Sequence, residues 1–147
     1  MHKPNVTVAM VVKCAERYLL VEERDKSTGQ RVLNQPAGHL EANESLIAAA
    51  QRELLEETGL NLAPQGLVGI YSLQARNGTH YLRFCFFAEL DEASETAPQD
   101  SDIIACHWLN IAQIKEQPLR SSIVLTCIDD AQNRPILPLE YLRHCQD

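Results

Sequence analysis

The N-terminal part of the chain has the pattern of short β-strands. Residues 6–12 and 18–21 are runs rich in β-branched and other apolar side chains, and the short polar segment between them suits a hairpin turn. Residues 22–31 are polar and contain a glycine, which predicts a loop. Residues 33–38 are punctuated by a proline and a glycine, so they predict the start of another element and not a long strand.

The pattern changes to a helical period over residues 45–58. This segment contains no glycine or proline, can be capped at its start by Asn43 or Ser45, and is closed by Gly59. Its apolar side chains fall within an arc of about 100° at helical spacing, as expected of a helix that packs on a core. They are Leu46, Ile47, Ala50 and Leu54.

Strands and helices both occur in the second half of the chain. Residues 67–73 and 81–90 predict two strands, and the Asn77-Gly78 pair between them is a turn signal, so a second hairpin is expected. An acidic exposed loop, a short strand, a helical turn and a longer helix follow at residues 91–102, 103–109, 111–116 and 121–131. This order predicts an α/β fold of the α+β kind, with helices on the faces of a mixed sheet.

Length and composition limit the classes of function. The 147 residues suit a single domain spanning 1–147, and 45% apolar with 22% charged residues is ordinary for a globular protein. The net charge of −7 argues against partners such as nucleic acid or an anionic membrane. A polyphosphate substrate would therefore need a local cation.

The chain shows no targeting or disulfide pattern. Its N-terminus lacks the apolar core and cleavage site of a signal peptide, and no segment is apolar for long enough to span a membrane, so we expect a cytoplasmic protein. The five cysteines are widely spaced and never form a CxxC pair, which predicts reduced thiols and neither a disulfide framework nor a zinc site.

Three glutamates in the predicted helix indicate chemistry. Glu53, Glu56 and Glu57 lie at i, i+3 and i+4, so they share one side of a turn, and they border the apolar stripe. Such a cluster is most often a solvated acidic face. That explanation fits poorly here, because Glu53 and Glu57 repel each other and acids near a helix C-terminus oppose its dipole. A divalent ion would offset this repulsion, and oxygen-only ligands favour magnesium, manganese or calcium over zinc.

Residues upstream extend this cluster. Gly38 permits a tight turn and close approach of the backbone to a ligand, and Glu44 can bring a fourth carboxylate from the start of the helix. Residues 38–60 read GHLEANESLIAAAQRELLEETGL, which matches G-x5-E-x7-R-E-U-x-E-E-x-G-U at every fixed position, where U is a bulky aliphatic residue. This pattern is the Nudix signature, and the chain therefore resembles the Nudix (MutT/Nudix) hydrolases.

The resemblance implies a fold and a cofactor. It implies an α/β/α sandwich around a mixed sheet, in which the signature forms a loop-helix-loop. This segment would bind Mg²⁺, with Mn²⁺ as a substitute, next to the diphosphate of a nucleoside diphosphate derivative. The ion would offset charge on the phosphate oxygens and lower the pKa of a water that attacks the phosphoanhydride.

The resemblance also implies roles for individual residues. Metal binding would fall to Glu53, Glu56, Glu57, Glu44 and the backbone at Gly38. Catalysis would fall to Glu53 as the candidate general base, Glu56, and Arg52, which orients the glutamates and reaches Glu56 at i+4. Family members also draw the base from a loop outside the signature. The acidic loop offers Glu95, Asp100 and Asp102 as alternatives.

Sequences outside the signature resemble one branch of the family, the NudJ-type bacterial phosphatases. The resembling stretches are NQPAGHLEANESL, YLRFCFFAEL, DSDI, PLRSSIV and PLEYL. This resemblance implies removal of phosphate from nucleoside tri- and diphosphates and from the hydroxymethylpyrimidine diphosphate of thiamin synthesis. The partner would be a small-molecule nucleotide or pyrimidine diphosphate, and the enzyme would be a monomer or a homodimer.

Several residues are candidates for contact with the substrate. Arg83 and Arg120 are candidate phosphate clamps because a guanidinium can bind two phosphate oxygens, and His39 can hydrogen-bond a phosphate. Aromatic side chains can stack on a base, although burial in the core is their commoner role. Those considered are Tyr71, Tyr81, Phe84, Phe86 and Trp108.

Two other functions remain open on the sequence. One is a pyrophosphohydrolase for ADP-ribose or a dinucleoside polyphosphate, which would release AMP. The other is a nucleotide-sensing module that binds without turnover, although degenerate sensors usually lose signature acids and this chain retains all of them.

Overall fold

A mixed sheet and three helices make up the computed structural model, which describes residues 1–147. Its strands are β1 (Asn5–Cys14), β2 (Arg17–Arg24), β3 (Arg31–Asn34), β4 (Ala37–His39), β5 (Gly66–Gln74), β6 (His80–Leu90) and β7 (Ile103–Leu109). Its helices are α1 (Leu46–Thr58), α2 (Ile111–Lys115) and α3 (Ile123–Asn133), followed by the 3-10 turn η1 (Leu139–Tyr141).

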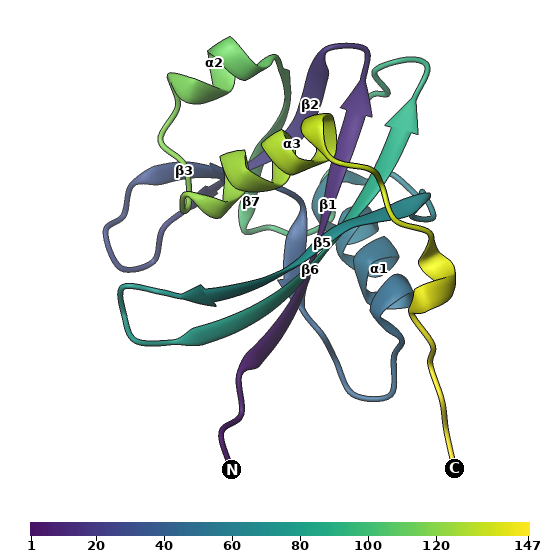
Figure 1. Cartoon of the computed structure of the whole chain (residues 1–147). Coiled ribbons are helices and arrows are strands. Elements are labelled where there is room, and N and C mark those ends of the chain that lie inside the picture. The colour runs from purple at the N-terminus through teal and green to yellow at the C-terminus, as the bar shows by residue number, and fades with distance from the viewer.

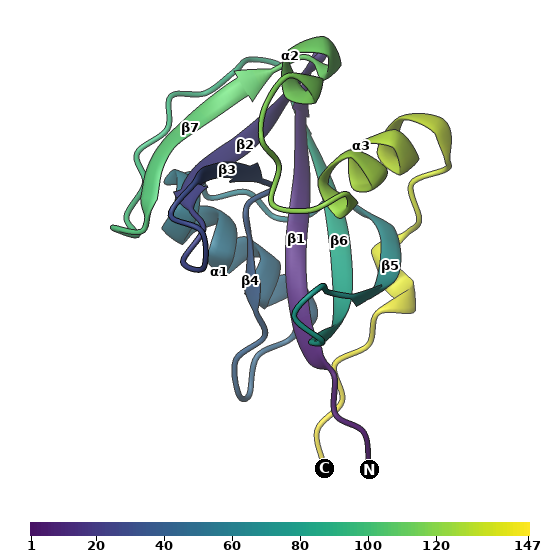
Figure 2. The same ribbon diagram turned by 90° about the vertical axis from the view of Figure 1, so that its left-hand side faces the viewer.

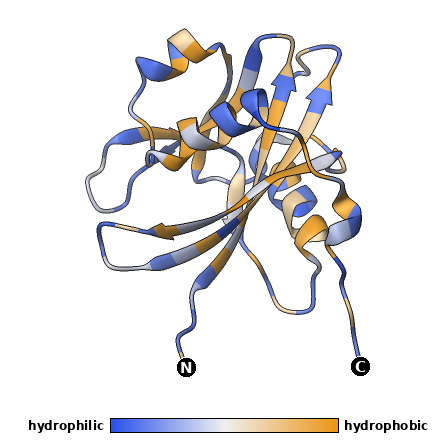
Figure 3. Cartoon of the chain, in the orientation of Figure 1, coloured by the Kyte–Doolittle hydropathy of each residue, from blue (hydrophilic) through white to orange (hydrophobic).

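The helices cover both faces of the sheet. α1 lies on one face, and α2 and α3 lie on the other, as Figures 1 and 2 show from two directions. Each face has its own apolar core: Leu54 of α1 packs with Phe86 on one side, and Val124 of α3 packs with Cys85 on the other. Hydrophobic residues concentrate in the central strands, while the helices alternate in character (Figure 3). The α/β/α sandwich expected from the sequence is confirmed.

The central strand β1 divides its partners along its length. It pairs in parallel with β6 throughout, from Asn5 opposite Tyr81 to Cys14 opposite Leu90. On its other side, the first part of β1 pairs with β4 and its last residues pair with β2. β3 and β7 extend the sheet from β2, and β5 extends it from β6. The linker from β3 to β4 therefore crosses from one part of the sheet to the other, directly beside α1.

Most of the predicted elements are confirmed. Residues 6–12 and 18–21 lie in the hairpin of β1 and β2, and β5 and β6 form the second hairpin, with Gly78 at a φ of 87° in its turn. The predicted helix at 121–131 begins and ends two residues later, as α3. η1 was not predicted.

The predicted loop at residues 22–31 is wrong at both ends. β2 continues to Arg24 and β3 begins at Arg31, because the two strands pair from Val21 opposite Asn34 to Arg24 opposite Arg31. The charged side chains that suggested a loop are accommodated by partners across the sheet. Glu22, for example, contacts Arg31 at 3.3 Å and His107 at 2.8 Å.

Two further expectations concern the cysteines and the membrane. All five cysteines are free thiols, and four of them are at least partly buried. None of the helices combines the length and the apolar character that a membrane crossing requires.

Candidate active site

Helix α1 places the signature glutamates beside β4. The Ser45 side chain accepts a hydrogen bond from the Ala48 amide at 3.0 Å and so caps the start of the helix, and Gly59 ends it in the left-handed conformation at a φ of 76°. The predicted stripe, including Ala50 and Leu54, packs into the core against β1. This packing fixes the rotation of the helix, so the glutamates of its last turns face the β4 edge of the sheet.

Glu57 is a carboxyl group held out of water. Its side chain is only 6% exposed, and its Oε1 accepts a hydrogen bond from the Ala37 amide at 2.8 Å. Burial, together with the nearby charges of Glu53, Glu23 and Asp100, raises the pKa of Glu57 to about 8, although the bond from Ala37 acts in the opposite direction. A cation at this position would stabilise the ionised form, which the surroundings otherwise disfavour.

Gly38 is required for space next to Glu53. A Cβ atom at residue 38 would overlap the carboxylate of Glu53, so any other residue would displace that side chain. Gly38 was expected to permit a tight turn and a close approach to a ligand; in the structure it lies in the middle of β4, and the group that approaches it is the Glu53 carboxylate. Burial raises the pKa of Glu53, and Arg52 opposes that shift.

Arg52 ties the acidic residues together. It holds Glu44 with two bonds, from Nε at 3.0 Å and from Nη2 at 2.8 Å. Its Nη1 donates to Glu53 at 2.9 Å and to Glu56 at 3.3 Å, and its Nη2 also reaches the His39 carbonyl at 3.1 Å. These bonds raise the pKa of Arg52 above its ordinary value and lower that of Glu44. The expected contact of Arg52 with Glu56 is present.

The carboxylates do not form a ready-made ligand cluster. No three His, Cys, Asp or Glu side chains converge closely enough to hold an ion, because Arg52 takes up oxygens of Glu44, Glu53 and Glu56. Both oxygens of Glu44 are engaged, since Oε1 also accepts from the Glu41 amide at 2.8 Å. The geometry therefore suits Glu44 as a positioning residue for Arg52. The other three acids, one of which is the buried Glu57, still offer an all-oxygen donor set, which suits a hard divalent cation.

The acidic loop is anchored to the end of α1. The amides of Gln99 and Asp100 both donate to the Glu56 carbonyl at 2.9 Å, so Asp100 lies close to the signature glutamates. Asp100 and Asp102 are also near enough to raise the pKa of Glu23. Glu95 is exposed and makes no such contact. Of the three alternative bases, Asp100 is therefore the best placed.

Glu23 is a site residue that sequence reasoning missed. It lies on β2, and its carboxylate pairs with Arg120 at 3.1 Å. Burial raises the pKa of Glu23, whereas Arg120 and a hydrogen bond with Asn34 lower it. Its charge also contributes to the raised pKa of Glu57. Recognising that β2 extends through the charged residues after Val21 would have placed Glu23 in the sheet.

The candidate substrate residues lie in different settings. Arg120 is half exposed and occupied by Glu23. His39 is exposed at the edge of β4, and its ring centroid lies 6.4 Å from that of Tyr81. Arg83 is 7% exposed and has no carboxylate partner.

Most of the candidate aromatic side chains are packed in the core or hydrogen-bonded within the protein. Phe86 is fully buried and Phe84 packs against the same core. The hydroxyl of Tyr71 donates to α3 at 2.7 Å, and the Nε1 of Trp108 donates to the acidic loop at 3.1 Å. Tyr81, which is partly exposed and near His39, remains the aromatic candidate for contact with a substrate.

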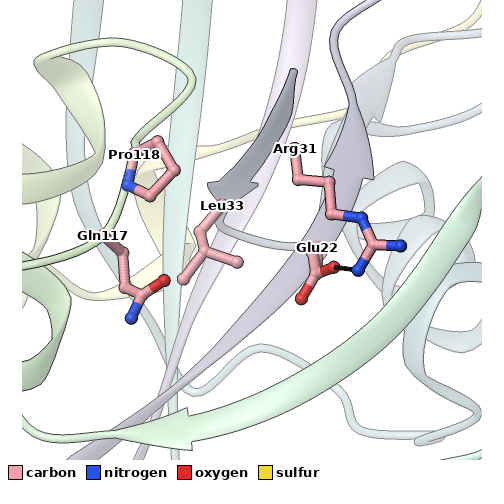
Figure 4. Close-up of a pocket in the computed structure, with 5 residues that line it drawn as sticks. All are labelled: Glu22, Arg31, Leu33, Gln117 and Pro118. Carbon is pink, nitrogen blue, oxygen red and sulfur yellow. Dashed lines mark hydrogen bonds and ion pairs between the residues drawn. The ribbon is translucent and has the colours of Figure 1, made fainter. Parts of the chain in front are cut away.

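Two surface pockets lie away from this site. One, of about 160 Å³, is lined by Glu22, Arg31, Leu33, Gln117 and Pro118 (Figure 4). A second, of about 340 Å³, lies between β5 and the segment after α3. Neither contains a residue of the 38–60 segment. The chemistry of the side chains, and not the size of a hollow, identifies the candidate site.

Comparison with known proteins assigns the family. The NUDIX domain model matches residues 1–125. The chain belongs to the NUDIX family, and it is a phosphohydrolase.

Its relatives define the branch. The chain is 44% identical over 143 residues to the Phosphatase NudJ of Shigella boydii serotype 4 (strain Sb227), covering 97% of this chain and 92% of that protein. It is 43% identical, with the same coverage, to the Phosphatase NudJ of Escherichia coli (strain K12). The predicted resemblance to the NudJ-type enzymes is confirmed.

Solved structures agree. A NUDIX hydrolase from Nitrosomonas europaea superposes with a TM-score of 0.89 at 42% identity, covering 97% of this chain and 98% of that one. The NUDIX domain of Shewanella oneidensis NrtR, complexed with ADP ribose, has a TM-score of 0.78 at 20% identity, covering 91% and 90%. At that identity the second likeness concerns the fold alone.

Proposed function

We propose that this chain is a magnesium-dependent phosphohydrolase that cleaves phosphoanhydrides of nucleoside tri- and diphosphates or of hydroxymethylpyrimidine diphosphate. The observation that carries the proposal is Glu57, a buried carboxyl group directed at the same edge as Glu53 and Glu56. A fold gains nothing from burying a carboxyl among other acids, whereas a cation bound there would offset their charges. The similarity to NudJ phosphatases supports the reaction class.

In this proposal Glu53, Glu56 and Glu57 hold the ion, and Mn²⁺ can substitute for Mg²⁺. When bound, the ion would neutralise charge on the phosphate oxygens and make a water molecule more acidic. Two bonds to Glu44 hold Arg52 in place. Glu53 and Glu56 could therefore turn from Arg52 toward the ion while Arg52 keeps its position. Glu53 is the candidate general base, with Asp100 as the best-placed alternative.

A substrate panel tests the proposal. Orthophosphate and pyrophosphate release is measured from nucleoside tri- and diphosphates and from hydroxymethylpyrimidine diphosphate, with magnesium and with a chelator. We expect turnover that requires the metal and falls at least about 100-fold in Glu57→Gln. Glu140→Gln is the matched control, because Glu140 is exposed in η1 and makes no contact with the site. Full activity of Glu57→Gln would contradict the assigned role.

The same panel separates the alternatives. Release of AMP from ADP-ribose or a dinucleoside polyphosphate, with no turnover of the proposed substrates, would identify the chain as a pyrophosphohydrolase of that kind. Nucleotide binding without any turnover at saturating magnesium would identify a sensing module.

A further inference from the structure

Arg83 is a buried cation without an anionic partner. Its Nη2 donates to the Gln35 Oε1 at 3.0 Å and, more weakly, to the Asn34 Oδ1 at 3.4 Å, and both acceptors are neutral amides. Its Nε is buried and has no hydrogen-bond acceptor. The side-chain hydrogen bonds of Arg83 come from Nη2 alone. Other arginines of the chain do have carboxylate partners. These are Arg31, Arg52, Arg120 and Arg134.

Burying the Arg83 guanidinium in this way is unfavourable unless a further group pairs with its charge. A charge removed from water is normally paired with an opposite charge and has its hydrogen bonds satisfied. Gln35 and Asn34 fix the position of the guanidinium but neutralise none of its charge. The missing group is therefore an anion with oxygen acceptors.

The amides that hold Arg83 belong to the segment that also holds the active site. Asn34 and Gln35 lead directly into β4, whose first residue, Ala37, donates its amide to Glu57. Asn34 lies close enough to Glu23 to lower the pKa of that carboxyl, and the charge of Glu23 in turn acts on Glu57. Residues 34–37 thus connect the guanidinium at one end with the acidic cluster at the other.

The sheet register gives the separation of the two groups. Thr7 of β1 lies opposite His39 of β4 on one side and Arg83 of β6 on the other. Since neighbouring strands are about 4.8 Å apart, the backbone of Arg83 lies roughly 10 Å from β4. A diphosphate and an extended arginine side chain can span that distance together.

The first turn of α3 helps to fix the amide that holds Arg83. Gln35 also donates from Nε2 to the Val124 carbonyl at 2.8 Å, so its side chain is held between α3 and the Arg83 guanidinium. This second bond orients the Oε1 of Gln35 toward Arg83.

We propose that Arg83 binds a phosphoryl oxygen of the substrate and so makes affinity depend on the phosphate groups. The inference rests on the proposed function, because it takes the glutamates to hold the metal beside the same phosphates. A phosphate suits the site better than a neutral carbonyl of a base, since the charge of Arg83 is uncompensated and its hydrogen bonds engage Nη2 alone. Gln35 and Asn34 are positioning residues in this proposal.

Calorimetric titration tests the role of Arg83. Inorganic pyrophosphate and ADP are titrated, with magnesium, into the wild-type protein and into Arg83→Met and Arg83→Lys. We expect both ligands to bind at least about tenfold more weakly to Arg83→Met, as for loss of a charged hydrogen bond. Arg83→Lys should recover part of the loss, because it restores the charge but not the planar fork. Arg134→Gln is the matched control, since Arg134 is mostly exposed and pairs with Asp130.

The outcomes distinguish a role of Arg83 in phosphate binding from a purely structural role. Wild-type affinity for pyrophosphate in folded Arg83→Met would overturn the proposal, and so would weaker binding of ADP alone, which would assign Arg83 to the organic group. If Arg83→Met does not fold, Arg83→Lys decides: an unchanged affinity for pyrophosphate would again overturn the proposal. These titrations need no turnover, so they give an answer about Arg83 even if no substrate of the panel is hydrolysed.

Discussion

Arg52 and Arg83 both contact the segment that contains β4, and their surroundings differ in charge. Arg52 bonds to the His39 carbonyl, whereas Arg83 bonds to Asn34 and Gln35 just before the strand. Arg52 is surrounded by carboxylates, bonding to Glu44, Glu53 and Glu56. Arg83 has only amide acceptors. The first region has an excess of negative charge and the second an uncompensated positive charge. A metal ion bound to a diphosphate carries positive charge that the acidic region lacks and negative charge that Arg83 lacks. One bound metal–diphosphate complex would therefore neutralise both regions.

The largest effect should come from Glu53. Glu53→Gln keeps the size of the side chain but removes its charge and basicity, and we expect turnover to fall by about 10² to 10⁴. Steady-state kinetics with the best substrate measures the loss. Asp100→Asn is the comparison: a larger loss in that variant than in Glu53→Gln would transfer the role of base to the acidic loop.

Gly38→Ala should come next. The added Cβ overlaps the Glu53 carboxylate, so the carboxylate must move while its charge is kept. A displacement of about 1 Å in an active site costs on the order of 100-fold, and we expect a loss of that size in turnover with little change in melting temperature. Gly29→Ala would be a poor control, because Gly29 has a φ of 74°. Ala48→Gly, on the exposed side of α1, tests whether destabilising the helix alone has the same effect.

Glu44→Gln should have a smaller effect. The substitution weakens the two hydrogen bonds between Glu44 and Arg52 without removing a proposed metal ligand. Changes of this kind lower metal affinity or activity by about 10- to 100-fold. We expect a lower turnover with an unchanged number of bound manganese ions, counted by calorimetry. A lost metal ion would show instead that Glu44 is itself a ligand.

The last effect concerns stability as a function of pH, and not turnover. Glu57 has a pKa of about 8 in the fold against an ordinary 4.5, so the folded state binds its proton more tightly than the unfolded state. This contribution is fully present below about pH 4.5 and is lost as the pH rises toward 8, by at most about 1.4 kcal/mol per pH unit. Without metal, the free energy of unfolding of the wild type should therefore fall relative to Glu57→Gln over this range. Denaturant unfolding at several pH values measures the difference, and parallel curves would contradict a raised pKa.

The part of the site that is local in sequence could be predicted from sequence. The glutamates, Arg52 and Gly38 lie within one loop and one helix, where helical spacing already indicates which side chains share a side. The apolar stripe of α1 predicted which way the helix faces, and its packing is as expected. Both hairpins were also predictable, because each has its turn between adjacent strands.

The rest depends on contacts distant in sequence. The parallel pairing of β1 with β6 places Arg83 one strand away from β4, and no local pattern indicates that register. Glu23 was hidden because charged residues in succession favour a loop by propensity, whereas pairing with β3 keeps them in a strand. The engagement of Glu44 by Arg52 likewise depends on the loop before α1 folding back.

The most direct test is the linkage between magnesium and pyrophosphate. Pyrophosphate affinity is measured by calorimetry with and without magnesium, in the wild type and in Glu57→Gln. The pyrophosphate and magnesium concentrations are the same for both proteins. We expect magnesium to strengthen binding more than tenfold in the wild type and far less in Glu57→Gln. An equal gain in both proteins, or no gain in either, would contradict a metal held by the signature glutamates.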